Sequence, residues 1–114
     1  MASYVPRKGD WVYLNFDPQS GHEQAGRRPA LVLSPSNYNR KVGLVLLVPI
    51  TSQVKGYPFE VIVPEGMPVN GVILSDQVKS LDWRVRRAEF ICALPGRLVS
   101  QVLEKILSLL TTHL

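Results

Sequence analysis

The hydrophobic positions of this chain form several short apolar runs followed by one longer amphipathic segment. The short runs are rich in aliphatic, β-branched and aromatic side chains and are separated by stretches of turn-forming residues, which is the pattern of β-strands joined by turns. They comprise residues 11–16, 30–33, 42–48, 59–63 and 72–74. The run at 42–48 is almost wholly apolar, which predicts a strand buried on both faces. The first part of the chain is therefore predicted to form a β-sheet.

A further strand is indicated by alternation instead of a continuous apolar run. Apolar and charged residues alternate from Leu81 to Arg86, with the period of two expected of a half-buried strand. In such a strand Arg84 and Arg86 project together from the polar face. Residues 19–27 are polar and contain glycine, which predicts a long loop. Residues 34–39 predict a turn or one short helical turn.

The period changes after Pro95, a residue that suits the first turn of a helix. Apolar residues then recur at steps of three and four, as in an amphipathic helix; they are Leu98, Val102, Leu103, Ile106 and Leu110. The apolar face of this helix could cover the sheet or lie at a subunit boundary, and packing on the core is the favoured interpretation. Short strands followed by one helix predict a single domain over residues 1–114, mainly β with a C-terminal helix and built as a small SH3-like β-barrel.

Composition adds a basic charge to this picture. The chain has 114 residues, a hydrophobic share of 46% and a formal charge of +4, with an isoelectric point near 9.5. The size and hydrophobic share fit one globular domain, and the charge favours polyanionic partners. The single cysteine, Cys92, cannot form an intrachain disulfide and is predicted to be a small core residue within an apolar run.

Nothing in the sequence indicates export or membrane insertion. Residues 1–7 lack the apolar core of a signal peptide. The longest apolar run, at residues 43–50, is too short to cross a bilayer. The protein is therefore expected to be cytoplasmic and to have no membrane partner.

The side chains that several common reactions need are missing from the sequence. His22 and His113 lie at opposite ends of the chain, and no group of His, Cys, Asp or Glu has the spacing of a metal site. No glycine-rich phosphate loop opens a helix, and no serine sits in a Gly-Xaa-Ser-Xaa-Gly turn. The sequence therefore predicts no metal ion and no other cofactor, and it argues against nucleotide hydrolysis and acyl transfer.

Charged residues gather in a glycine-containing stretch before the second apolar run. Within residues 21–29, Glu23 supplies a carboxylate, and Arg27 and Arg28 supply adjacent guanidinium groups. Pro29 favours an extended conformation for Arg28 as the strand begins. Arg28 is therefore expected where a loop meets a rigid sheet, a position that fixes a charged group and leaves it open to a ligand. A polar turn with solvated charges is the alternative.

The same stretch carries a sequence signature. Glu-Gln-Ala-Gly-Xaa-Arg-Pro-Ala-Leu-Val-Leu-Ser-Pro, at residues 23–35, is similar to the signature of the MazF/PemK toxin family, which comprises small endoribonucleases partnered with antitoxins. Further blocks occur in the order of the family at residues 9–10, 16–18, 48–51, 55–60, 76–80 and 83–84. The chain therefore resembles this family over most of residues 4–87.

The resemblance implies a fold and a set of catalytic residues. The implied fold is the small barrel of the CcdB and MazF proteins. Arg28 matches the catalytic arginine of the family, and Thr51 matches its catalytic threonine. Glu23 is a candidate general base, with a loop-ordering salt bridge to Arg27 as the alternative. For Thr51 the alternative is a hydroxyl bonded to the backbone at a strand end.

These groups suit cleavage of RNA by its own 2′-hydroxyl. The hydroxyl attacks the adjacent phosphorus and expels the 5′-oxygen of the next nucleotide, so neither a metal nor an external nucleophile is required. The enzyme must accept one proton, donate another and stabilise the charge that grows on the phosphoryl oxygens. Arg28 can hold those oxygens with a forked pair of donors. The expected products carry 2′,3′-cyclic phosphate and 5′-hydroxyl ends.

Polar residues in and near the matched blocks are candidates for binding single-stranded RNA. They offer amide, hydroxyl, carboxylate and cationic groups, and they comprise Gln24, Arg27, Gln53, Lys55, Ser75, Asp76, Gln77, Lys79, Arg84 and Arg86. Phe16 or Trp83 could stack on a base, although a core position is the favoured interpretation for such aromatic residues.

The resemblance also implies partners. Single-stranded RNA is the expected substrate, and the cognate antitoxin is expected to be acidic because the surface it must cover is basic. A second copy of the chain in a C₂ homodimer is the third expected partner. Two other functions stay open. One is a DNA-gyrase poison of the related CcdB type, against which residues 23–29 and Thr51 argue; the other is a non-catalytic barrel that binds nucleic acid.

Overall fold

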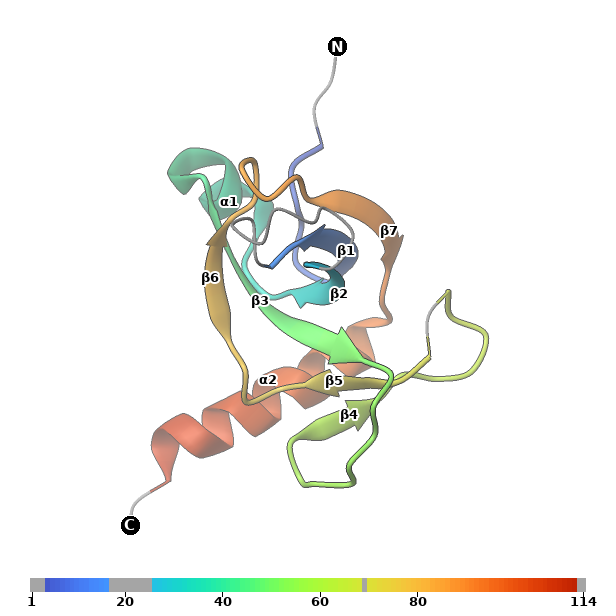
Figure 1. Ribbon diagram of the computed structural model, residues 1–114. Helices are drawn as coiled ribbons and strands as arrows, with labels where there is room; N and C mark the ends of the chain where they lie inside the picture. The colour runs from blue at the N-terminus through green and yellow to red at the C-terminus, as the bar shows by residue number, and fades with distance from the viewer. Residues whose placement is uncertain (1–3, 17–25, 69, 113–114) are drawn as a thin grey trace.

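Figure 1 shows the computed structural model, which describes residues 4–16, 26–68 and 70–112. Within these ranges seven short strands and one short helix precede a long C-terminal helix. In chain order the elements are β1 (Asp10–Asn15), β2 (Arg27–Val32), α1 (Ser36–Val42), β3 (Leu44–Thr51), β4 (Glu60–Ile62), β5 (Val72–Leu74), β6 (Lys79–Asp82), β7 (Glu89–Ala93) and α2 (Gly96–Thr111). The predicted fold class, mainly β with a C-terminal helix, is confirmed.

The strands form one antiparallel sheet arranged around β3. Its order is β4-β5-β3-β2-β1-β7, and β6 pairs with β3 outside this path. One edge of β3 carries β2, whereas the other edge carries β6 at residues 44–47 and β5 at residues 50–51. Among the described strands the path ends at β4 and β7 without closing, so the small barrel expected from the sequence is open.

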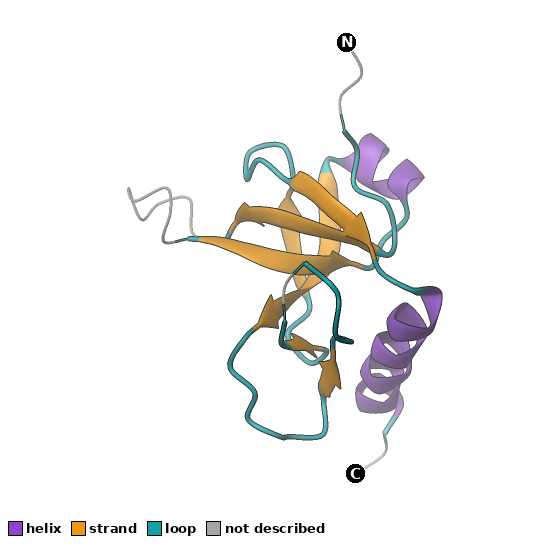
Figure 2. Cartoon of the chain, turned by 90° about the vertical axis from the view of Figure 1, so that its right-hand side faces the viewer, coloured by secondary structure: helices purple, strands orange, loops and turns teal. Residues whose placement is uncertain are grey.

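The central strands are buried on both faces because their alternate side chains enter two different cores. Trp11 and Leu31 belong to a core that includes the buried face of α2. Their neighbours Val12 and Val32 belong to a second core on the other face of the sheet. Figure 2 shows α2 running along one side of the strands. Two cores on a single small sheet hold β1, β2 and β3 rigidly, and these strands carry the site described below.

The strand predicted at residues 42–48 is shifted along the chain. Val42 ends α1, and Gly43 follows as its left-handed C-cap with φ 82°. β3 therefore begins at Leu44 and continues beyond the predicted end to Thr51. Leu46 is 37% exposed, whereas residues 47–50 are all buried. Burial on both faces is thus confirmed only for the second half of this strand.

The strand predicted over residues 81–86 is wrong beyond Asp82, where β6 ends. The carboxylate of Asp82 accepts hydrogen bonds from the backbone N–H groups of Arg84 at 3.0 Å and Val85 at 2.9 Å, which closes a turn. Trp83 is buried while the two residues after it are exposed. A turn that inserts one aromatic residue into a core produces the same local alternation as a strand, and this explains the error.

Other elements extend the predicted ones. The turn or short helical turn predicted at residues 34–39 overlaps α1, which begins at Ser36 and runs on to Val42. β2 begins at Arg27, three residues before the predicted strand, because it pairs with β1 from Asn15 onward. β7 was not predicted as a strand; it holds Cys92, which is partly buried against the core under α2, as predicted for this residue.

The helix α2 packs on the sheet with its N-terminal half. Leu98, Val99 and Val102 are buried in the core. In the C-terminal half, Leu107 and Leu110 are 57% and 76% exposed. Packing on the core, favoured from the sequence, is thus confirmed for the first half of the helix. In the described part of the chain, no helix combines the length and the apolar character that a membrane span requires.

A buried polar cluster joins the N-terminal segment to α1 and to the turn after β6. The amide nitrogen of Asn39 donates to the backbone carbonyl oxygens of Pro6 at 2.8 Å and Ser34 at 3.0 Å, and its amide oxygen accepts from the Ser34 hydroxyl at 2.6 Å. The indole N–H of Trp83 donates to the backbone carbonyl of Asn39 at 2.8 Å. Because Asn39 is fully buried, these bonds keep its polar atoms satisfied and fix the frame behind β3.

Candidate active site

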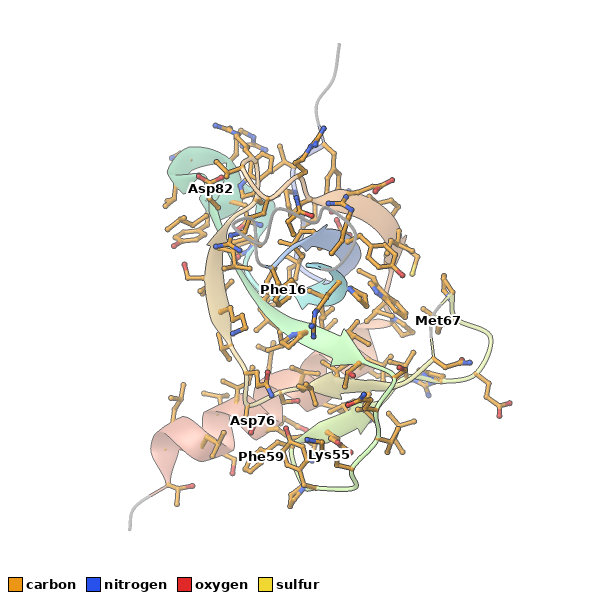
Figure 3. All side chains as sticks on the ribbon, in the orientation of Figure 1. Phe16, Lys55, Phe59, Met67, Asp76 and Asp82 are labelled. Carbon is orange, nitrogen blue, oxygen red and sulfur yellow. The ribbon has the colours of Figure 1, made fainter. Side chains whose placement is uncertain are left out.

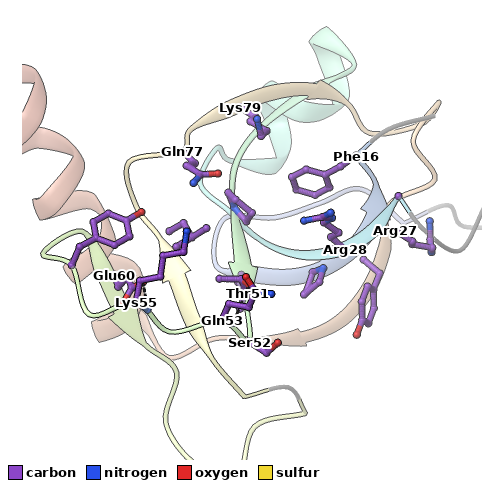
Figure 4. Close-up of a pocket in the computed structure, with 17 residues that line it drawn as sticks. Phe16, Arg27, Arg28, Thr51, Ser52, Gln53, Lys55, Glu60, Gln77 and Lys79 are labelled. Carbon is purple, nitrogen blue, oxygen red and sulfur yellow. Dashed lines mark hydrogen bonds between the residues drawn. The ribbon is translucent and has the colours of Figure 1, made fainter. Parts of the chain in front are cut away.

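A basic groove lies where β2 and β3 meet the segment that joins β3 to β4 (Figure 4). Its volume is about 840 Å³. Of the residues that line it, four are cationic and one is acidic: Arg27, Arg28, Lys55 and Lys79 against Glu60. This excess of positive charge in a concave surface attracts a polyanion.

Arg28 and Thr51 reach the groove from neighbouring strands. β2 and β3 run antiparallel with Ala30 opposite Pro49. The pairing ends there, and Arg28 lies two residues before Ala30 while Thr51 lies two residues after Pro49, so both residues lie at the same end of the β2–β3 pair. Figure 4 shows both side chains at the groove. The fold thus brings together the two residues that the family resemblance identified as catalytic.

The two adjacent arginines have different surroundings. Arg27 donates to the Glu89 carboxylate at 3.0 Å, to the backbone carbonyl of Arg87 at 2.9 Å and to the Asn15 side chain at 3.3 Å. These contacts fasten the start of β2 to β7 and to the turn before it. Arg28 is exposed and lines the groove. Arg27 therefore has a structural role in addition to the RNA contact predicted for it, whereas Arg28 is available to a ligand.

The Thr51 hydroxyl lies at the end of β3. It accepts a hydrogen bond from the backbone N–H of Gln53 at 3.2 Å, which is the backbone contact considered as the alternative role for this residue. Accepting that bond leaves the hydroxyl proton to be donated to another group. The Thr51 backbone is also closely approached by Gly71, where an added Cβ would lie 2.0 Å from the Thr51 carbonyl oxygen. Gly71 has φ +135°, so no other residue fits there without moving Thr51.

Four more of the predicted RNA-binding residues line the groove. Gln53 and Lys55 follow β3, and both are exposed. Gln77 and Lys79 lie between β5 and β6 and at the start of β6, and both are exposed as well. Figure 4 shows Lys55 and Gln77 on the side of β3 away from Arg28, with Gln53 beside Thr51. The groove therefore offers amide and ammonium groups around the position of Thr51.

Other predicted RNA-binding residues lie outside the groove. Ser75 is fully buried, so its predicted contact with RNA is wrong: a hydroxyl at 0% exposure cannot reach a ligand. Asp76 accepts a hydrogen bond from the Tyr57 hydroxyl at 2.8 Å and does not line the groove. Glu23 and Gln24, together with His22, lie outside the described residues, and their predicted roles stay predictions.

The arginines of the turn after β6 have structural contacts. The guanidinium of Arg84 lies 4.7 Å from the ring centroid of Trp83. Arg86 donates to the backbone carbonyls of Asn15 at 3.1 Å and Phe16 at 2.5 Å. Neither arginine lines the groove, because the residues after Asp82 form a turn and not the predicted strand. Trp83 is buried and is a core residue, as favoured, whereas Phe16 does line the groove.

Two groove residues, Tyr57 and Glu60, were not identified from the sequence although they lie in a matched block. The hydrogen bond to Asp76, followed by burial, raises the pKa of the Tyr57 phenol above its ordinary value. In the sequence, the only indication was that an aromatic residue and a carboxylate follow closely after Lys55. The fold of this segment is what directs both side chains toward the groove. In the ranges that the structure describes, no three side chains of His, Cys, Asp or Glu are grouped so that they could hold a metal ion.

Together, the fold and the groove define a small β-sheet protein with a site for a polyanion, and comparison with known proteins identifies the family. Residues 7–110 match the family model of the PemK-like, MazF-like toxins of type II toxin–antitoxin systems. The chain is 56% identical over 88 residues to the endoribonuclease toxin MazF of Escherichia coli K12, a match that covers 77% of this chain and 78% of that protein. The chain therefore belongs to the PemK-like, MazF-like toxin family.

Solved structures agree with this assignment. The crystal structure of MazF from Deinococcus radiodurans has a TM-score of 0.87 and 54% identity, and the match covers 96% of this chain and 100% of that chain. A crystal structure of MazE–MazF from the same organism has a TM-score of 0.86 and 48% identity, with 97% of this chain and 100% of that chain covered. The fold predicted from the family resemblance is thus shared with solved MazF structures.

Proposed function

We propose that this protein is the toxin of a toxin–antitoxin pair and cuts single-stranded RNA in the cytoplasm without a metal ion. Its family membership and its 56% identity to an endoribonuclease toxin make the chain an endoribonuclease. The observation that supports the proposed chemistry is the placement of Arg28 and Thr51 in one basic groove, at the same end of the β2–β3 pair. The nucleophile is the 2′-hydroxyl of the RNA itself.

Arg28 stabilises the phosphoryl oxygens as negative charge grows on them. Its guanidinium presents two parallel N–H donors and stays charged at any working pH. Arg28 pairs with Leu14 of β1, and two residues further on β2 becomes buried and pairs with β3 as well, so the backbone of Arg28 is held before the RNA arrives. Fixed donors at the site of developing charge are usually the largest electrostatic contribution to catalysis.

Thr51 adds a neutral hydrogen bond to the same phosphate. Its hydroxyl oxygen accepts from the Gln53 N–H, which leaves the hydroxyl proton to be donated to the phosphate. Glu23 remains the proposed general base for the 2′-hydroxyl. Lys55 and Lys79 bind flanking phosphates, while Gln53 and Gln77 contact base edges.

The proposed inhibitor is an acidic antitoxin segment that covers the groove. A crystal structure from Deinococcus radiodurans contains MazE with MazF, and a mycobacterial endoribonuclease of the same fold has been solved in complex with its cognate antitoxin. A carboxylate-rich segment would compete with RNA phosphates for the four cationic side chains of the groove. Such a segment can be disordered when free and fold on binding.

The toxin is proposed to act as a C₂ homodimer. The C-terminal half of α2 leaves Leu107 and Leu110 exposed, and Ile62 on β4 is 72% exposed. α2 contacts β4, so these apolar side chains belong to neighbouring elements. A second copy would remove this apolar surface from water. A single sharp mass of one chain in light scattering at micromolar concentration would refute the dimer.

Incubation of a long RNA with the protein in EDTA tests the proposal. Cleavage in the chelator, with cut ends mapped by sequencing, is the expected result. Two outcomes would favour the alternatives. Intact RNA together with blocked DNA supercoiling by gyrase would indicate a gyrase poison, and a gel shift without cleavage would indicate a binding protein.

A further inference from the structure

The segment between β3 and β4 is held by a carboxylate at its end. Glu60 accepts hydrogen bonds from two consecutive backbone N–H groups, that of Lys55 at 3.0 Å and that of Gly56 at 2.8 Å, one on each carboxylate oxygen. Gly56 has φ 84°, a left-handed conformation that glycine adopts without strain. A charged acceptor on two adjacent donors fixes the turn just before Tyr57.

The same segment is fastened from two other directions. Lys105 on α2 donates to the backbone carbonyl of Pro58 at 2.6 Å. The Tyr57 hydroxyl donates to the Asp76 carboxylate at 2.8 Å, which ties the segment to the turn after β5. Figure 3 shows Lys55 and Asp76 at the same end of the molecule, away from Asp82. Tyr57 therefore has fixed backbone on both sides and a fixed hydroxyl.

These contacts leave the ring of Tyr57 as a rigid, partly exposed wall of the groove. The Tyr57 hydroxyl donates its proton to the hydrogen bond with Asp76, and that bond raises the pKa of the phenol, so Tyr57 is a weaker acid than an ordinary tyrosine. The other aromatic walls are placed differently. Phe16 packs against the second core, and Tyr13 lies opposite Pro29 in the β1–β2 pair.

We propose that Tyr57 is a stacking platform for one unpaired base of the RNA, in a subsite separate from Arg28 and Thr51, and that Asp76 positions its ring. The inference rests on the proposed function, because it requires single-stranded RNA in the groove. Aromatic rings bind the faces of unpaired bases in many RNA sites. A ring that is already held in place loses little freedom when the base arrives. Asp76, predicted from the sequence to contact RNA, is thus a positioning residue.

Equilibrium binding of an uncleavable RNA tests the stacking role. The ligand is a short RNA around a mapped cut site with 2′-deoxyribose at the cut position. Tyr57→Ala is expected to weaken its binding roughly 5- to 150-fold, the range for losing one base–aromatic stack. Tyr57→Phe keeps the ring and is expected to bind far better than Tyr57→Ala. The matched control is Tyr38→Ala, which removes a tyrosine exposed on α1 and should bind as the wild type does.

An abasic scan of the same RNA locates the stacked base. Each nucleotide in turn is replaced by an abasic ribose, and binding to the wild type and to Tyr57→Ala is compared. At one position the abasic change should weaken binding to the wild type but not to Tyr57→Ala, since both changes remove the same contact. Absence of such a position, or equal losses for Tyr57→Phe and Tyr57→Ala, would overturn the stacking role.

Asp76→Asn tests the positioning role with two readouts. NMR titration of the tyrosine ring should show the pKa of Tyr57 falling toward its ordinary value, since the Asp76 hydrogen bond is the largest cause of the raised pKa. The KM for RNA should rise while the rate at saturating RNA stays unchanged; an unchanged KM would overturn the role. If the wild type cleaves RNA but Tyr57→Ala binds RNA as tightly as the wild type does, the stacking inference is wrong and the proposed function stands. Failure of the wild type to cleave would defeat the proposed function itself.

Discussion

Arg28→Ala is the substitution that separates catalysis from folding most cleanly. Arg28 lines the same groove as Thr51, and its side chain is exposed. Removal of one preorganised donor to a developing oxyanion costs on the order of 10²–10³ in rate, or about 2.7–4 kcal/mol of barrier. Removal of an exposed side chain changes the free energy of unfolding by about 0.5 kcal/mol or less. The variant is therefore expected to be folded and nearly inactive.

Single-turnover cleavage of a fluorescent RNA measures this effect. The enzyme is in excess over RNA and above the dissociation constant, so that the observed rate reports the chemical step and not binding. Arg28→Lys is the graded comparison: it keeps the charge and loses the forked pair of donors, so its rate should fall between those of the wild type and Arg28→Ala.

Arg27→Ala is the matched control because it removes the neighbouring arginine. Arg27 contacts Glu89, the Arg87 carbonyl and Asn15, so its loss should lower the unfolding midpoint and leave most of the single-turnover rate. A folded Arg28→Ala protein that cleaves at a near-normal rate would refute the reasoning. An Arg27→Ala protein that is as inactive as Arg28→Ala would show that the two roles are assigned wrongly.

Three further predictions concern other residues. Thr51→Ala should slow single-turnover cleavage by roughly 3- to 10-fold, the value of one neutral hydrogen bond, and Thr51→Ser should restore it; equal rates for all three proteins would leave Thr51 with a structural role only. Gly71→Ala should lower the free energy of unfolding by at least about 2 kcal/mol and reduce cleavage by the folded fraction, because the alanine Cβ would lie 2.0 Å from the Thr51 carbonyl oxygen. A urea unfolding curve unchanged from that of the wild type would contradict this. Burial, followed by the hydrogen bond to Asp10 at 2.5 Å, raises the pKa of Tyr4, so the folded state keeps the phenol neutral. The stability that Tyr4 contributes is complete below the pKa of about 10 that tyrosine has in the unfolded chain, and it is lost as the pH rises above that value. The stability difference between wild type and Tyr4→Phe should therefore shrink above that pH in urea titrations, and a constant difference would be the contrary result.

The predictable part of the fold was the part governed by local pattern. The strand at residues 72–74 was placed at its observed bounds because an isolated apolar run between turn residues has one simple interpretation. The strand predicted at residues 81–86 was wrong beyond Asp82 because alternation of apolar and charged residues indicates which side chains are buried. It does not determine the conformation of the backbone between them. There the Asp82 carboxylate, bonded to two backbone N–H groups, ends the strand.

The candidate site divides in the same way. Arg28 and Thr51 were identified because the family signature marks them, and the β2–β3 register then brings them together. Ser75 was misassigned because sequence position does not show which way a side chain points at the end of β5. Tyr57 was overlooked because its orientation depends on Asp76, which follows it by 19 residues. Contacts of that separation depend on tertiary structure, so a pattern within the chain cannot reveal them.

Analysis of the ends left by the wild-type protein tests the central claim most directly. A synthetic RNA with one mapped cut site is cleaved in EDTA, and the products are examined by mass spectrometry beside the same RNA with 2′-deoxyribose at the cut. The account predicts 2′,3′-cyclic phosphate (or the 3′-phosphate formed when it opens) and 5′-hydroxyl ends, and no cleavage of the 2′-deoxy RNA. Products with 5′-phosphate ends, or cleavage of the 2′-deoxy RNA at the same site, would contradict attack by the 2′-hydroxyl.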